Sequence, residues 1–241
     1  MQTDLTGKVA LVTGGGRGIG RAVALALGAV GAHVVVAART QSQIDEVGRE
    51  ITGTGGAALP CAVDIADAES VRGLFATVRE SCGRLDVLVN NAGIGLYGAV
   101  KDFPVEDLDR VVAVNLRGTF LCCQEAMKMM VPQGSGYIIN ISSVVGFKGY
   151  PNQAAYTATK HAVMGLTKTL AVEAGKDGIR VSAILPGGVD TGMVREARPD
   201  LDPSILLGPE DVAGAVLYLL SLSDRAAIDQ IYIRRRTSQP F

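Results

Sequence analysis

Tryptophan is absent from the 241 residues, and histidine and cysteine are scarce, with two and four copies. None of the cysteines forms a CxxC pair; they are Cys61, Cys82, Cys122 and Cys123. Structural zinc sites need clustered cysteine and histidine ligands, and small secreted folds need a disulfide framework. The sequence therefore predicts neither a metal site nor a disulfide scaffold.

The chain also has no large excess of positive or negative charge and no long apolar run. The 23 basic and 24 acidic residues leave a formal net charge of −1, which gives no electrostatic reason to expect a nucleic-acid or anionic-membrane surface. No apolar run reaches the ~20 residues of a membrane span, and the first residues lack the basic and apolar regions of a signal peptide. We therefore expect a soluble, cytoplasmic protein that binds neither nucleic acid nor a membrane.

Short apolar runs alternate with helical patterns along the whole chain. Most of these runs are continuous Val/Ile/Leu stretches, which is typical of strands buried on both faces of a parallel sheet. The predicted strands are Val9–Thr13, Val34–Ala38, Ala57–Val63, Val87–Asn90, Tyr137–Ile141, Arg180–Leu185 and Gln230–Ile233. The predicted helices cover 19–30, 41–52, 67–82, 105–130, 152–174 and 209–221. This alternation predicts a single domain over residues 1–241, a Rossmann-type doubly wound α/β fold with a seven-stranded parallel sheet and helices on both faces.

A glycine-rich turn, Thr13-Gly14-Gly15-Gly16-Arg17-Gly18-Ile19-Gly20, separates the first predicted strand from the first predicted helix. Glycines there let a pyrophosphate approach backbone N–H groups at the positive end of a helix. The strict GxGxxG spacing is not met, and no Gly-Lys-Ser/Thr follows, which excludes a mononucleotide P-loop. The turn matches TGxxxGxG instead. By itself this pattern could be only a tight turn, but its place after the first strand favours a dinucleotide site.

The end of the second predicted strand carries Ala38 followed by Arg39. A dinucleotide site that prefers NAD places a carboxylate near this point to hold the ribose 2′-hydroxyl. A guanidinium can instead hold a 2′-phosphate through two parallel hydrogen bonds, and Arg17 supplies a second cation. The alternative is that Arg39 is a solvated residue that opens a loop. We interpret the pattern as favouring NADP(H) over NAD(H).

Tyr156 and Lys160 are four residues apart in a predicted helix, so their side chains share one face. A free phenol has a pKa of about 10, and a nearby ammonium stabilises its ionised form. YxxxK alone is often a chance match. Here Ser143, after the fifth predicted strand, precedes Tyr156 by thirteen residues. Asn90-Asn91-Ala92-Gly93 closes the fourth strand and Asn115 lies in the next helix. These positions meet at the sheet edge where ligands of open α/β folds bind.

With these motifs in this order, the chain resembles the small single-domain branch of the short-chain dehydrogenase/reductase family, from Gly7-Lys8 to about Asp229. The Asp64-Ile65 pair and Pro186–Thr191 add to the resemblance. It implies a catalytic set of Asn115, Ser143, Tyr156 and Lys160. It implies cofactor contacts from Gly14, Arg17, Gly18, Ile19, Gly20, Arg39, Asp64, Ile65, Asn91, Ala92, Gly93, Tyr156, Lys160, Pro186, Gly187, Val189 and Thr191.

The resemblance also implies a role for each catalytic residue. Tyr156 would be the general acid and base, and Ser143 would hydrogen-bond the substrate oxygen. Lys160 would hold the nicotinamide ribose and lower the pKa of the phenol, and Asn115 would fix a water that relays protons to it. At the cofactor, Asp64 would bind the adenine amino group. Structural alternatives stay open for three motifs, because Asn91 could be a strand-end cap, Asp64 a helix cap and Pro186-Gly187 a turn.

The expected activity is an NADP-dependent interconversion of a ketone, or 3-oxoacyl group, and a secondary alcohol. Two alternatives are a catalytically idle NADP-binding sensor, and a sugar-nucleotide epimerase or dehydratase, which usually needs a further substrate region. Only seventeen residues separate Thr191 from Pro209, so we expect a short lid and an open pocket. We also expect a homodimer or homotetramer formed through helices 105–130 and 152–174, on faces that carry Leu116, Phe120, Met127, Val163 and Leu166.

Overall fold

A seven-stranded parallel sheet forms the centre of the molecule, with strand order β3-β2-β1-β4-β5-β6-β7. The computed structural model describes residues 3–197 and 202–239. The strands are β1 (Val9–Thr13), β2 (His33–Ala38), β3 (Ala57–Ala62), β4 (Val87–Asn90), β5 (Gly136–Ile141), β6 (Ile179–Pro186) and β7 (Gln230–Ile233). Each lies within two residues of its predicted bounds. The predicted fold class is confirmed.

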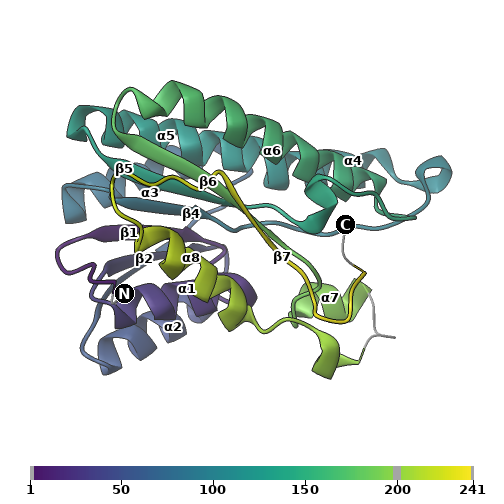
Figure 1. Cartoon of the computed structure of the whole chain (residues 1–241), viewed down its shortest axis with the longest axis horizontal. Coiled ribbons are helices and arrows are strands. Elements are labelled where there is room, and N and C mark those ends of the chain that lie inside the picture. The colour runs from purple at the N-terminus through teal and green to yellow at the C-terminus, as the bar shows by residue number, and fades with distance from the viewer. Residues whose placement is uncertain (1–2, 198–201, 240–241) are drawn as a thin grey trace.

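Helices cover both faces of the sheet (Figure 1). One layer contains α1 (Gly18–Ala29), α2 (Gln41–Gly53) and α8 (Pro209–Leu220). The other contains α3 (Ala68–Cys82), α4 (Val105–Val112), α5 (Thr119–Gln133) and α6 (Ala154–Gly175). Alternate residues of a strand point to opposite faces, so Ala10 and Val12 of β1 pack under the first layer while Val9 and Leu11 pack under the second.

Two local features differ from the prediction. The expected continuous helix 105–130 is divided, because a π-helical turn, Ala113–Gly118, separates α4 from α5. A short helix that the sequence did not predict, α7 (Gly192–Ala197), lies between β6 and α8. In π turns one extra residue widens the backbone ring, and such turns occur often at functional sites. Asn115 lies in the π-helical turn, which therefore determines the position of its side chain.

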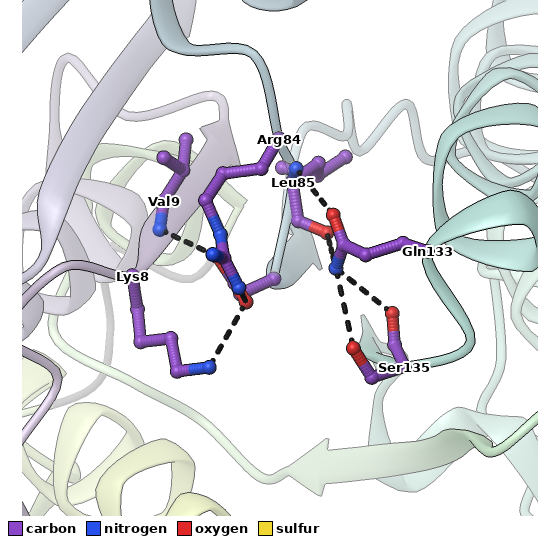
Figure 2. Close-up of polar contacts among 7 residues, drawn as sticks. Lys8, Val9, Arg84, Leu85, Gln133 and Ser135 are labelled. Carbon is purple, nitrogen blue, oxygen red and sulfur yellow. Dashed lines mark hydrogen bonds and ion pairs between the residues drawn. The ribbon is translucent and has the colours of Figure 1, made fainter.

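The amino-terminal ends of β1 and β4 are joined by a buried carboxylate, that of Asp86, which is 8% exposed. It accepts hydrogen bonds from the Val9 N–H at 2.9 Å and from the Arg84 Nε and Nη2 at 2.7 and 2.6 Å. The Lys8 ammonium lies 3.3 Å away. Gln133, at the end of α5, holds both the N–H and the carbonyl of Leu85 with its amide (Figure 2). Polar contacts therefore hold the amino-terminal ends of β1 and β4 together.

Three further properties concern the described part of the chain. No described helix has both the length and the apolar character needed to cross a membrane. The four cysteines are free thiols. Among residues 3–197 and 202–239, no three His, Cys, Asp or Glu side chains are grouped so that they could hold a metal ion.

Candidate active site

The strand order reverses between β1 and β4, and a cavity of about 360 Å³ opens at their carboxyl ends. In open α/β sheets ligands bind in the crevice at this point. Most of the expected site residues line the cavity: Gly14, Arg17, Gly18, Ile19, Arg39, Asp64, Ile65, Asn91, Ala92, Gly93, Tyr156, Lys160 and Thr191. The other expected residues are not among those that line it: Gly20, Asn115, Ser143, Pro186, Gly187 and Val189.

The glycine turn is tied to the end of β4. The Asn91 amide nitrogen donates to the carbonyls of Thr13 and Gly14 at 3.1 and 3.2 Å. A Cβ at Gly20 would lie 2.1 Å from the Gly14 carbonyl oxygen, so only glycine fits there. Gly14 itself has a φ of +65°, which favours glycine. Asn91 therefore caps a strand end, that of β1, and also lines the cavity. The structural and the cofactor-binding interpretations of this residue are compatible.

Part of the cavity lining is suited to a phosphate. Arg17, the N-cap residue of α1, makes no capping hydrogen bond with its side chain, and the first turn of α1 holds no acidic residue. The first N–H groups of that helix therefore face the cavity without an anionic partner. Arg17 and Arg39 are both exposed, and neither has a carboxylate within 4 Å among the described residues.

The same cavity is lined by Tyr156 and Lys160 on α6. The Tyr156 phenol hydrogen-bonds Ser143, and the Lys160 Nζ lies 5.7 Å from the centre of the phenol ring. The ammonium donates to the Ile141 carbonyl at 2.9 Å. These contacts require the first turns of α6 to lie against the end of β5, and the helical spacing of four places both side chains on that side. A proton donor (Tyr156), a hydroxyl (Ser143) and a buried cation (Lys160) therefore lie close together.

Burial controls the proton affinities of this group. It raises the pKa of the Tyr156 phenol, the neighbouring Tyr97 adds to that rise, and the hydrogen bond with Ser143 opposes it. Burial also lowers the pKa of Lys160 to about 8, because the ammonium is 5% exposed. Tyr156 is therefore protonated at neutral pH in this state of the protein, as a proton donor to a carbonyl oxygen must be.

Asn115 supports the site from the π turn and is 1% exposed. Its Oδ1 accepts from the Ile94 N–H at 2.8 Å, and its Nδ2 donates to the Ile94 carbonyl at 2.9 Å and to the Thr159 hydroxyl at 3.3 Å. A Cβ at Gly93 would lie 3.3 Å from the Asn115 Oδ1. The side chain thus holds the segment after β4 against α6. The expected water relay through Asn115 stays a prediction.

Asp64 and Ile65 follow β3 on the adenine side that the resemblance implied. The Asp64 carboxylate accepts from the Ala66 N–H at 3.0 Å, whereas Asp67 caps α3 by accepting from Glu69 and Ser70. The open alternative that Asp64 caps the helix is therefore wrong, because Asp67 performs that task. Both Asp64 and Ile65 line the cavity.

Some residues of the Pro186–Thr191 segment have a structural role, and Thr191 lines the cavity. Gly187 N–H donates to the Ile233 carbonyl at 2.7 Å, and Val189 bridges to Leu207. Pro186, Gly187 and Val189 therefore shape the turn after β6, while Thr191 reaches the cavity. The segment expected to form a short lid includes α7, whose Met193 lines the cavity. Residues 198–201 of that segment lie outside the described residues.

Several cavity residues were not expected from the motifs. They are Gly16, Ala38, Thr40, Gln43, Val63, Ile94, Val114, Ile141, Ser142, Gly192 and Met193. Gly16 and Ala38 belong to the glycine turn and the strand end discussed above, whereas the others had only their proximity to strand or helix ends as a signal. Ser142 differs from its neighbour Ser143, because its hydroxyl donates to the Lys160 carbonyl at 3.1 Å and so anchors α6 to β5.

Comparisons with known proteins agree with this architecture. The chain matches the family model for short chain dehydrogenase over residues 8–202. It is 44% identical over 223 residues to a 3-oxoacyl-[acyl-carrier-protein] reductase of Synechocystis sp., with 90% of each chain covered. A 3beta-hydroxysteroid dehydrogenase of Mediterraneibacter gnavus is 42% identical over 195 residues, which cover 80% of this chain and 70% of that one.

A solved structure extends the likeness to nearly the full length of the chain. A metagenomic short-chain oxidoreductase in complex with NADP is 35% identical, with a TM-score of 0.86, and the match covers 97% of this chain and 99% of that one. The chain therefore belongs to the short-chain dehydrogenase/reductase family and is an oxidoreductase of that family.

Proposed function

We propose that the protein interconverts a ketone, or 3-oxoacyl group, and a secondary alcohol with NADP(H), using Tyr156 as general acid and base. One observation carries this proposal. Tyr156 and Lys160, with Ser143 hydrogen-bonded to Tyr156, line the same cavity as a bare glycine turn and two arginines without carboxylate partners among the described residues. A dinucleotide placed along this cavity would have its charged groups at one end and its reactive ring at the other.

The residues present fit NADP(H). Gly14, Gly18 and the start of α1 would hold the pyrophosphate. Arg39, next to the small Ala38, would hold the 2′-phosphate with Arg17, because paired guanidinium hydrogen bonds match phosphate geometry. The related metagenomic oxidoreductase was solved in complex with NADP, which supports this choice. When bound, the nicotinamide supplies or accepts the hydride.

The side chains of this chain would manage the proton and the charge. In the reducing direction, the Tyr156 hydroxyl gives its proton to the carbonyl oxygen as that oxygen becomes an alkoxide. Ser143 hydrogen-bonds the same oxygen and stabilises its developing charge. The Lys160 ammonium stabilises the phenolate that remains. In the oxidising direction the phenolate takes the proton back, so one residue serves as both acid and base.

The named relatives support a secondary alcohol and its ketone as the substrate pair. One reduces 3-oxoacyl groups on a carrier protein and the other acts on a 3beta-hydroxysteroid; in both, the reacting carbon carries one oxygen and two carbon neighbours. We further propose that the protein is cytoplasmic and acts as a homodimer or homotetramer.

The proposal is tested by oxidation of NADPH and of NADH against 3-oxoacyl, aliphatic, aromatic and cyclic ketones. Turnover with NADPH should occur with at least one ketone class and be lost in Tyr156→Phe, which keeps the ring and removes the acid. Binding of NADPH without turnover of any ketone would favour the catalytically idle sensor. Turnover that survives in Tyr156→Phe would contradict the assigned acid.

A further inference from the structure

A second tyrosine touches the proposed acid. The rings of Tyr97 and Tyr156 meet edge to face, with centroids 5.8 Å apart and planes inclined by 69°. The Lys160 ammonium also contacts the Tyr156 ring. Tyr156 therefore contacts both a cation and a second aromatic ring. None of the family motifs in the sequence includes Tyr97.

The segment that carries Tyr97 is built to hold this ring in place. Gly98 N–H donates to the Asn152 carbonyl at 2.8 Å, which ties the segment to the turn before α6. Asn152 has a φ of +63°, a conformation that non-glycine residues rarely adopt. A Cβ at Gly95 would lie 2.2 Å from the Tyr97 hydroxyl oxygen. Any larger residue at position 95 would displace the Tyr97 side chain.

The other end of the segment is equally well held. Asn115 makes two hydrogen bonds to the backbone of Ile94. Residues 94–98 are thus fixed at one end to the π turn and at the other to the turn before α6, and the Tyr97 ring projects between these points onto Tyr156. The ring is half-buried, and its hydroxyl has no hydrogen-bond partner among the described residues.

We propose that Tyr97 is a positioning and specificity-determining residue of this active site. Its ring holds the Tyr156 phenol in its working orientation and limits the size of the ketone that can reach it. This inference rests on the proposed function for its kinetic consequences, but the contact itself has a consequence that does not need turnover. Covering the phenol excludes water, and exclusion of water opposes ionisation.

The decisive pair of variants is Tyr97→Phe and Tyr97→Ala. Both leave five of the six tyrosines, so their ultraviolet tyrosinate titrations compare equal numbers of phenols. Phenylalanine keeps the edge-to-face contact and alanine removes it. We expect one more phenol to ionise near the ordinary pKa of about 10 in the alanine variant than in the phenylalanine variant. That difference should disappear when Tyr156→Phe is added to both.

Kinetics test the two roles separately. Edge-to-face pairs of this kind correspond to about a 3- to 10-fold effect, so Tyr97→Ala should lower kcat by that factor for a small ketone. For a bulky cyclic ketone its KM should fall, because the opened space admits a larger group. The alkaline limb of the pH profile should move to lower pH in Tyr97→Ala and stay in place in Tyr97→Phe.

Phe147→Ala is the matched control for the loss of an aromatic contact. Phe147 meets Tyr232 edge to face at 5.1 Å and 83°, so its loss removes a similar pair without touching Tyr156. Any change in its tyrosinate titration should come from Tyr232, which loses the contact, and should therefore persist when Tyr156→Phe is added. Identical titrations for Tyr97→Phe and Tyr97→Ala would overturn the inference whether or not the protein turns over a ketone. Absence of turnover in every form, with the expected titration difference, would contradict the proposed function alone.

Discussion

Lys160 is expected to support activity while its burial lowers the stability of the fold. A buried ammonium is costly, and the pKa of Lys160 falls to about 8 because burial disfavours its charged form. Among the described residues the ammonium has one hydrogen bond, to the Ile141 carbonyl, and this does not replace full hydration. A residue kept at such a cost is usually functional, which agrees with the proposed role beside Tyr156.

We expect Lys160→Met to stabilise the protein at pH 7 by about 1–3 kcal/mol while abolishing turnover. At pH 7 the lysine is charged in both the folded and the unfolded state, so the wild type bears the full burial penalty. The folded-state pKa is lower than the unfolded value, so this penalty is relieved as pH rises from about 8 towards 10. Urea unfolding across that range should show the advantage of the variant shrinking. An advantage that grows with pH would contradict this assignment.

Arg39 is the residue on which cofactor choice depends. It is exposed at the cavity next to Ala38 and has no carboxylate partner among the described residues. Arg39→Asp should raise KM for NADPH about 10- to 100-fold, since the carboxylate repels the 2′-phosphate and the guanidinium hydrogen bonds are lost. KM for NADH should change little or fall, because a carboxylate there can hold the 2′-hydroxyl. Steady-state kinetics with both cofactors measure this; equal losses with NADPH and NADH would indicate a structural role.

At the scale of elements, the polar contacts of Asp86 between the amino-terminal ends of β1 and β4 lead to a stability prediction. The carboxylate of Asp86 is buried, which raises its pKa, but its bonds with Arg84, the Val9 N–H and Lys8 outweigh burial and lower it overall. A carboxyl with a lowered pKa stabilises the fold above its unfolded value of about 4 and loses that contribution as pH falls through the lowered native value. Asp86 is therefore one source of acid sensitivity.

Asp86→Asn should destabilise the protein by about 1–3 kcal/mol at pH 7, because it breaks charge-assisted bonds in a buried setting. The loss should be smaller near pH 3, because the carboxyl is protonated in the unfolded state there and the lowered native pKa contributes less stability. Asp107→Asn is the control, since its pair with Arg110 is exposed and such pairs contribute less than about 1 kcal/mol. Urea unfolding of the three proteins at both pH values provides the comparison. Equal effects of the two substitutions would show that burial of Asp86 does not matter.

The elements also show what the sequence can predict. The strands were found within two residues because continuous Val/Ile/Leu runs are distinctive, and β3 was found although Pro60 interrupts it at the sheet edge. The glycine turn and the Tyr156–Lys160 pair were found because their spacing has a local physical meaning. Position along the strands then predicted that the motifs would meet at one sheet edge.

Features that depend on distant contacts were not predictable in the same way. The π turn at Ala113–Gly118 lies in a stretch with an ordinary helical pattern, and Asn115 engages Ile94, 21 residues away. The edge-on contact of Tyr97 with Tyr156 joins two segments far apart in the chain. The helix α7 was missed because six residues are too few to show a clear periodicity. Each depends on how the sheet brings loops together.

At the scale of the whole molecule, part of the expected subunit interface needs correction. Val163 of α6 was expected in the subunit interface, but it is 1% exposed and is therefore buried within the protomer. Met127 and Leu166 are partly buried against the core between the sheet and this helical layer. Phe120 on α5 is different, because it is 49% exposed. The residues that remain uncovered in this layer include Leu108 and Val112 of α4.

Phe120 is therefore the residue through which the proposed assembly is best tested. A charge at the centre of an apolar contact between protomers would be buried without a partner, which is strongly unfavourable. Phe120→Asp should convert the wild-type oligomer to a smaller species in sedimentation velocity, with little change in the fold, because the side chain lies on the surface of the protomer. Tyr218→Asp on α8, in the opposite helical layer and 52% exposed, is the matched control and should retain at least a dimer through the α4–α5 face. A wild-type protein that sediments as a monomer at micromolar concentration, or an oligomer unaffected by Phe120→Asp, would contradict an assembly through this face.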